Sequence, residues 1–93
     1  MKKAYLIKKL PRSRSGADQA VYRVDPPMND YEGNGHSIVV ASSVRVLGEP
    51  ETYFFPANEE GDILDWSELP ASSRDILDHK EAFENAGYSV ISP

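Results

Sequence analysis

Apolar and polar residues alternate over much of this chain, which is the pattern of β-strands with one buried face. The clearest case is 37–47, where Val40 and Val44 fall on one face of a strand and Val39 and Ala41 on the other. Apolar residues on both faces are typical of a central strand. We therefore predict a central strand here, with Val40 and Val44 buried on the same face.

Shorter β-prone segments lie before and after this strand. We predict strands over 4–10, 20–24 and 51–55, a short returning hairpin arm over 62–66, and a last strand or extended tail over 88–91. The return is predicted at Asn-Glu-Glu-Gly, a type I turn sequence with glycine in the left-handed position.

The segment 25–36 is predicted to be a long loop. It contains Pro26 and Pro27, which lack the N–H that a strand ladder needs, and then Gly33-Asn34-Gly35. Because long loops are often functional, 26–35 is a second candidate surface.

One helix is predicted near the C-terminal end. Asp78 and Glu81 have the spacing of a capping box, Phe83 lies on an apolar stripe, and Gly87 stands where a helix ends. A helix this short must dock on the sheet. We expect its Phe83 side to cover the face that carries Val40.

These elements define the fold class. The chain is predicted to form a small single α+β domain over 1–93, a mainly antiparallel sheet of four to five strands with one C-terminal α-helix packed on it. The connections between the early strands are too short for the crossover helices of a parallel α/β sheet.

Charge is unevenly distributed along the 93 residues, whose formal net charge is −5. Residues 1–24 hold seven basic residues and one acid, whereas 25–93 hold three basic residues and fourteen acids. We interpret the two segments as neighbours that neutralise each other. The negative total disfavours nucleic acid as a partner. No apolar run is long enough for a membrane span, and there is no cysteine.

The titratable residues show no catalytic motif. His36 and His79 lack a second histidine at metal-ligand spacing, and His79 is expected to be an exposed residue at the helix start. No nucleophile elbow or phosphate-binding loop is present. We therefore predict no enzyme activity, no catalytic residues, no metal site and no cofactor.

An aromatic group and an acidic turn are the strongest candidates for an interaction site. Aromatic side chains supply contact area in protein interfaces, and acids orient a basic partner. The competing interpretation is that the aromatics are core and the acids form a solvated turn. The candidate interaction residues are Tyr53, Phe54, Phe55, Glu59, Glu60, Asp62 and Trp66.

The second half of the chain contains a distinctive string. Phe-Pro-Ala is followed by an acidic glycine turn, Asp-Trp-Ser-Glu-Leu, Leu-Asp-His and Ala-Gly-Tyr, over 51–88. This string resembles small proteins of actinobacteriophages, mycobacteriophages in particular. The resemblance implies phage origin and residence in the cytoplasm of a host bacterium.

The resemblance also implies a class of function. Some small phage proteins bind and redirect a host protein, and some are toxic to the host. We expect a phage-encoded binding protein, monomeric or weakly dimeric, that inhibits or redirects a host bacterial protein. The alternatives are an accessory or structural interaction protein of the phage, and an acidic nucleic-acid mimic that blocks host defence.

Overall fold

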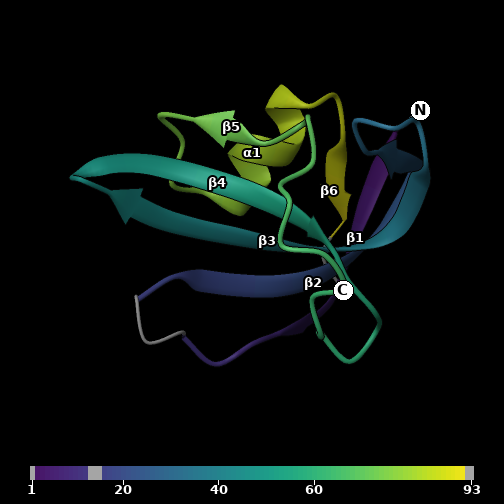
Figure 1. Ribbon diagram of the computed structural model, residues 1–93, viewed down its shortest axis with the longest axis horizontal. Coiled ribbons are helices and arrows are strands. Elements are labelled where there is room, and N and C mark those ends of the chain that lie inside the picture. The colour runs from purple at the N-terminus through teal and green to yellow at the C-terminus, as the bar shows by residue number, and fades with distance from the viewer. Residues whose placement is uncertain (1, 13–15, 92–93) are drawn as a thin grey trace.

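The β-prone segments form one curled sheet with a short helix on one face (Figure 1). The computed structural model describes residues 2–12 and 16–91. Within these residues the sheet has six strands in the order β5-β4-β3-β2-β1-β6. The elements are β1 (Lys3–Lys9), β2 (Asp18–Asn29), β3 (Gly35–Val46), β4 (Glu49–Pro56), β5 (Ser73–Arg74), α1 (His79–Asn85) and β6 (Ser89–Ile91).

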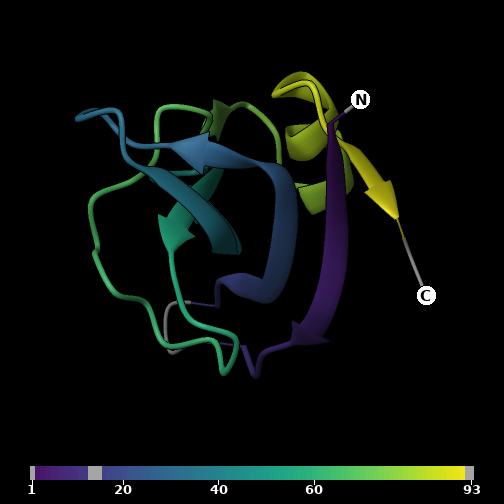
Figure 2. The same ribbon diagram turned by 90° about the vertical axis from the view of Figure 1, so that its right-hand side faces the viewer.

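The sheet is mixed, although the prediction of a mainly antiparallel sheet with one C-terminal helix is confirmed. The pairs from β1 to β5 are antiparallel, whereas β6 runs parallel to β1. The parallel pair arises because the chain crosses the sheet through α1 before β6 begins (Figure 2). The two-residue strand β5 was not predicted, because a segment so short shows no alternation.

The helix covers one face of the sheet, and it is not the face that we predicted. Phe83 is fully buried in the cluster that contains Val39 and Ala41, whereas Val40 belongs to the cluster on the opposite face. The expectation that Phe83 lies over Val40 is therefore wrong. Small side chains on the helix-covered face leave room for aromatic rings. Those rings are Tyr22, Phe54, Phe83 and Tyr88.

The opposite face has a smaller core. Val21, Val40 and Ala57 are buried there, and side chains from the loops after β1 and β4 pack against them. The prediction that Val40 is buried is confirmed, since none of its surface is exposed. Val44, farther along β3, is only partly buried. The middle of the strand, 39–43, is thus buried on both faces, and the cover decreases toward both ends.

The helix has the ends that the sequence predicts. The Asp78 carboxylate accepts a hydrogen bond from the Glu81 backbone N–H at 3.1 Å, and Gly87 follows the helix with φ of 90°. His79, however, is buried rather than exposed. It accepts from or donates to the Tyr22 hydroxyl through Nδ1 at 3.3 Å, and its Nε2 donates to the Asp18 carbonyl at 2.8 Å.

The predicted loop 25–36 is mostly strand. β2 continues to Asn29 and β3 begins at Gly35, so only a tight turn joins them. Pro26 and Pro27 are accommodated because they fall at an irregularity of the β2–β3 ladder, between Arg23 and Met28. No ladder N–H is required of them there.

Two turns of the molecule are built in the same way. In 30–34 and in 58–62, the first side chain accepts hydrogen bonds from the backbone N–H groups two and four residues later. The fourth residue is glycine with positive φ, 87° in Gly33 and 94° in Gly61. The prediction of a glycine turn at 58–61 is confirmed. The predicted arm 62–66 is no strand, however, because only the isolated bridge between Ala57 and Ile63 forms.

Candidate protein-interaction surface

Alternation along β4 separates the three aromatic residues of the predicted site. Phe54 points to the helix-covered side, where it is fully buried and its ring centroid lies 4.6 Å from that of Phe83. Phe54 is therefore a core residue, and the structure removes it from the surface on which it was predicted. Tyr53 and Phe55 point to the other side.

Trp66 completes an aromatic group on this open side. Its ring centroid lies 5.4 Å from that of Phe55, and the Tyr53 ring centroid lies 6.0 Å from that of Phe55. The prediction that these two stretches meet is confirmed. Phe55 is largely covered, whereas 71% of Trp66 is exposed. We call Tyr53, Phe55 and Trp66 the aromatic surface.

The acids beside the aromatic surface are Glu51 and Glu68. The Tyr53 hydroxyl donates a 2.7 Å hydrogen bond to Glu51 Oε2. This bond, with help from burial and from the charges of both glutamates, raises the pKa of Tyr53 to about 12. Glu68 lines the same open hollow of about 230 Å³ as the three aromatic rings. Neither glutamate is among the predicted interaction residues, because the contacts with the rings depend on β4 pairing and on the path of the loop after it.

The turn between β2 and β3 borders the same region. A second hollow, of about 150 Å³, lies between this turn and the segment 65–68, and Glu68 lines both hollows. Tyr31 at the turn is 76% exposed. The two candidate surfaces of the sequence, 26–35 and the aromatic group, are thus neighbours in the fold.

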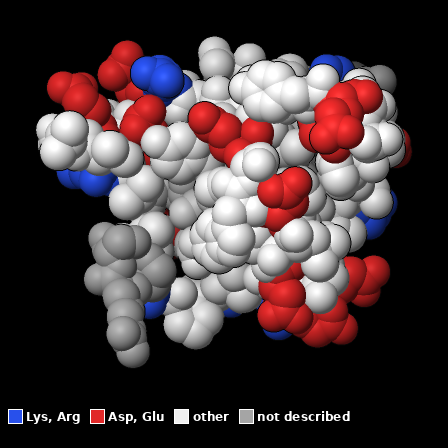
Figure 3. All heavy atoms as spheres, in the orientation of Figure 1, with Lys and Arg blue, Asp and Glu red and all other residues white. Residues whose placement is uncertain are grey.

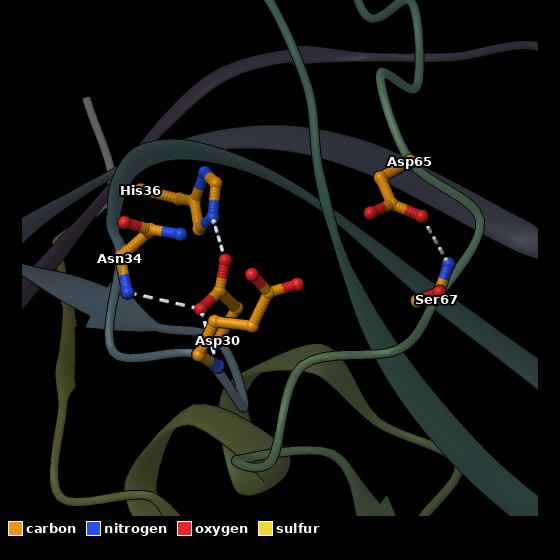
Figure 4. Close-up of polar contacts among 6 residues, drawn as sticks. Asp30, Asn34, His36, Asp65 and Ser67 are labelled. Carbon is orange, nitrogen blue, oxygen red and sulfur yellow. Dashed lines mark hydrogen bonds and ion pairs between the residues drawn. The ribbon is translucent and has the colours of Figure 1, made fainter.

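Asp30 organises that turn (Figure 4). Its Oδ1 accepts from the backbone N–H groups of Glu32 and Asn34, and its Oδ2 accepts from His36 Nε2 at 2.9 Å. The bond from His36 is the largest of the influences that lower the pKa of Asp30 from 3.8 to about 2. Asp65, across the second hollow, accepts from the Ser67 N–H at 2.9 Å. Both acids are thereby held in fixed orientations.

The predicted acidic turn is exposed but separate from these hollows. Glu59, Glu60 and Asp62 all lie at the surface of the turn 58–62. None of the three lines the hollow beside the aromatic rings. They contribute charge to the molecule without lining that hollow. Figure 3 shows more acidic than basic side chains on this face, with acids above and to the right of an uncharged central area.

The basic residues near the N-terminus that the structure describes form no direct ion pairs with the acids. Among residues 2–12 and 16–91, the ion pairs are His36 with Asp30 and Arg74 with Glu51. Instead, Lys2 lies over the Tyr88 ring at 5.1 Å and Arg23 over the Tyr5 ring at 4.4 Å. Only the Lys2–Tyr88 contact joins the basic segment 1–24 to the acidic segment 25–93, since Arg23 and Tyr5 both belong to the first.

His79 has a structural position on the other side of the sheet. Both of its ring nitrogens are engaged inside the protein, and its ring meets Tyr22 edge-on. Burial, followed by the charges of Asp18 and Asp78, raises the pKa of Tyr22 to about 12. The arrangement fixes the start of α1 to β2.

Two further observations bear on the predicted classes. In the described part of the chain, no three histidine or acidic side chains are grouped so that they could hold a metal ion. None of the helices there has the length and apolarity to cross a membrane. Comparison with protein-family models, curated proteins and solved structures gave no match.

Proposed function

We propose that this protein acts by binding another protein through the aromatic surface. The observation that carries the proposal is Trp66, a large side chain that is 71% exposed and rests on Phe55 instead of entering the core. Exposed aromatic groups with a polar border are typical of protein-binding sites. Tyr53 and Glu68 line the same hollow and extend the contact area.

The neighbouring turn enlarges this surface. Tyr31 and Glu32 line the second hollow together with Glu68. A partner that covers both hollows would bury two exposed aromatic side chains, Tyr31 and Trp66. The resemblance to small phage proteins supports a host bacterial protein as the partner, with inhibition or redirection of that protein as the result.

The test is capture of a partner from host lysate by the whole protein and by matched variants. Trp66→Ser removes the exposed ring, and we expect capture to fall by tenfold or more, since central aromatic contacts dominate interfaces. Leu47→Asn is the control. Leu47 is also exposed, at 99%, but it lies in the β3–β4 turn, at the opposite end of β4 from Phe55. Equal loss in both variants would contradict the proposal.

A second variant tests the acidic turn separately. Changing Glu59, Glu60 and Asp62 together to serine should leave stability almost unchanged, because all three are exposed. Since they do not line the aromatic hollow, we expect slower capture and little change in the amount bound at equilibrium. Complete loss of capture in this variant would move the interface from the aromatic surface to the turn.

A further inference from the structure

In the part of the chain that the structure describes, aromatic rings lie under a cation in two places, and a third aromatic group has no cation over it. Lys2 covers Tyr88 and Arg23 covers Tyr5. No described lysine or arginine lies over Tyr53, Phe55 or Trp66. This third aromatic group nevertheless has the Glu68 carboxylate beside it, and a binding site for a cation commonly includes such an acid.

The geometry of the third group is that of an open cup. The Tyr53 and Phe55 ring planes are inclined by 41°, and the Phe55 and Trp66 planes by 59°. All three residues line one shared space, the hollow of about 230 Å³. The faces of aromatic rings carry partial negative charge and attract cations.

Negative charge predominates around the cup, and the one cation whose charge acts on Tyr53 is the exposed Arg74. Glu68 lines it, and in the described residues no cation lies within ion-pair distance of that carboxylate. Glu51 is only weakly neutralised, because Arg74 Nε is 3.9 Å from Oε1 and the Arg74 side chain is 87% exposed. The whole chain adds a net charge of −5, which attracts basic partners over a longer range.

We propose that the cup formed by Tyr53, Phe55, Trp66 and Glu68 binds an arginine side chain of the partner protein. This inference rests on the proposed function and specifies what the aromatic surface recognises. A guanidinium is planar, so it stacks on a ring face while its edge donates two hydrogen bonds to a carboxylate. The cup offers ring faces and the Glu68 carboxylate together. A lysine ammonium would use the rings but has no planar fork.

The single tryptophan makes the cup directly observable, because the emission of Trp66 is the only tryptophan signal of the protein. The probes are three short peptides, acetylated and amidated, with arginine, citrulline or lysine between two glycines. Citrulline has almost the shape of arginine without its charge. We expect the arginine peptide to change the emission saturably and to bind about fivefold or more tightly than the citrulline peptide.

Matched charge variants locate the effect. Glu68→Gln should weaken binding of the arginine peptide by about threefold or more, whereas Glu59→Gln, with the same change of net charge away from the cup, should not. Thermal unfolding of both variants checks that the fold is kept. Absence of saturable binding, equal affinity for arginine and citrulline, equal affinity for lysine, or equal loss in both variants would each overturn the inference.

Capture from lysate separates this inference from the proposed function. If Trp66→Ser abolishes capture while Glu68→Gln captures as well as the unmodified protein and the arginine and citrulline peptides bind alike, the surface is an interface that does not select arginine. If Trp66→Ser captures normally, the proposed function itself fails. Joint loss of capture in Trp66→Ser and Glu68→Gln, with selective binding of the arginine peptide, supports both.

Discussion

Phe54 and Trp66 come from one aromatic-rich region of the chain, and the structure gives them opposite roles that a pair of substitutions distinguishes. Phe54→Ala removes a ring with no exposed surface, which packs at 4.6 Å against Phe83. Truncation of a buried phenylalanine costs about 3–5 kcal/mol. The free energy of unfolding of a domain this size is roughly 5–15 kcal/mol, so the loss is a large fraction of the total.

This loss of stability can be measured as a decrease in the melting temperature, Tm. For a chain of this length each kcal/mol shifts the unfolding temperature by about 4–8 °C, so Phe54→Ala should lower Tm by at least about 12 °C. Circular dichroism during heating measures it. Trp66→Ser should cost about 1 kcal/mol or less, because most of the ring is already in solvent.

The melting temperatures of the variants can also contradict these roles of Phe54 and Trp66. A Tm for Phe54→Ala within about 5 °C of the unmodified protein would show that the ring is not in the core, since no buried phenylalanine is removed so cheaply. If Phe54→Ala does not fold, Phe54→Leu retains most of the apolar volume and should show a smaller decrease in Tm. A larger decrease for Trp66→Ser than for either variant would reverse the assignment of core and surface.

Three further predictions concern the turns and the second core. Gly61→Ala should destabilise more than Gly33→Ala in urea unfolding, because both have positive φ but only the Cβ at 61 would lie 2.7 Å from a Leu10 methyl; equal losses would contradict this. The lowered pKa of Asp30 stabilises the fold above pH 3.8, and this contribution is lost as the pH falls toward 2. In Asp30→Asn the free energy of unfolding should therefore depend less on pH between 3.8 and 2. An unchanged pH dependence would contradict the lowered pKa of Asp30. Val40→Asp should cost several kcal/mol, because it buries an unpaired charge at a position with no exposure, and an unchanged Tm would contradict it.

The sequence predicts most elements of the sheet because their periodicity is local. Alternation identifies β3, and the cap at Asp78 with Gly87 nine residues later identifies α1. The face that the helix covers is not local information. Val40 is larger than Ala41, yet the helix packs over Ala41, because space for the rings of Phe54 and Phe83 decides the packing.

The candidate site could likewise be predicted only as far as its features are local in the sequence. The aromatic residues and their exposure on one side of β4 follow from alternation, but the identity of the inward residue does not. The proximity of Tyr31 to Glu68 depends on how far β2 and β3 extend. That length was not predicted, because the prolines of β2 are typical of a loop. The sequence nevertheless contains a signal for the turn at 30–34, because this segment and 58–62 share a polar first residue and a glycine in fourth place.

The aromatic surface is held in place by the same strand that anchors the core. Since side chains alternate along β4, the burial of Phe54 requires Tyr53 and Phe55 to face the other side. Thr52 reinforces this register, because its hydroxyl accepts from Ser43 at 2.8 Å and donates to the Ile76 carbonyl at 2.7 Å.

Trp66 is the one member of the aromatic surface that comes from a loop, and that loop is fastened close by. The Leu69 backbone N–H donates to the Phe54 carbonyl at 2.8 Å, and the Leu69 side chain is buried in the helix-side core. The ring of Trp66 therefore rests on Phe55 three residues from a fixed point. A surface ordered before binding loses less conformational entropy when a partner arrives, so a small contact area can still give useful affinity. For a chain of 93 residues with a thin core, this arrangement lets one strand provide both stability and the proposed binding surface.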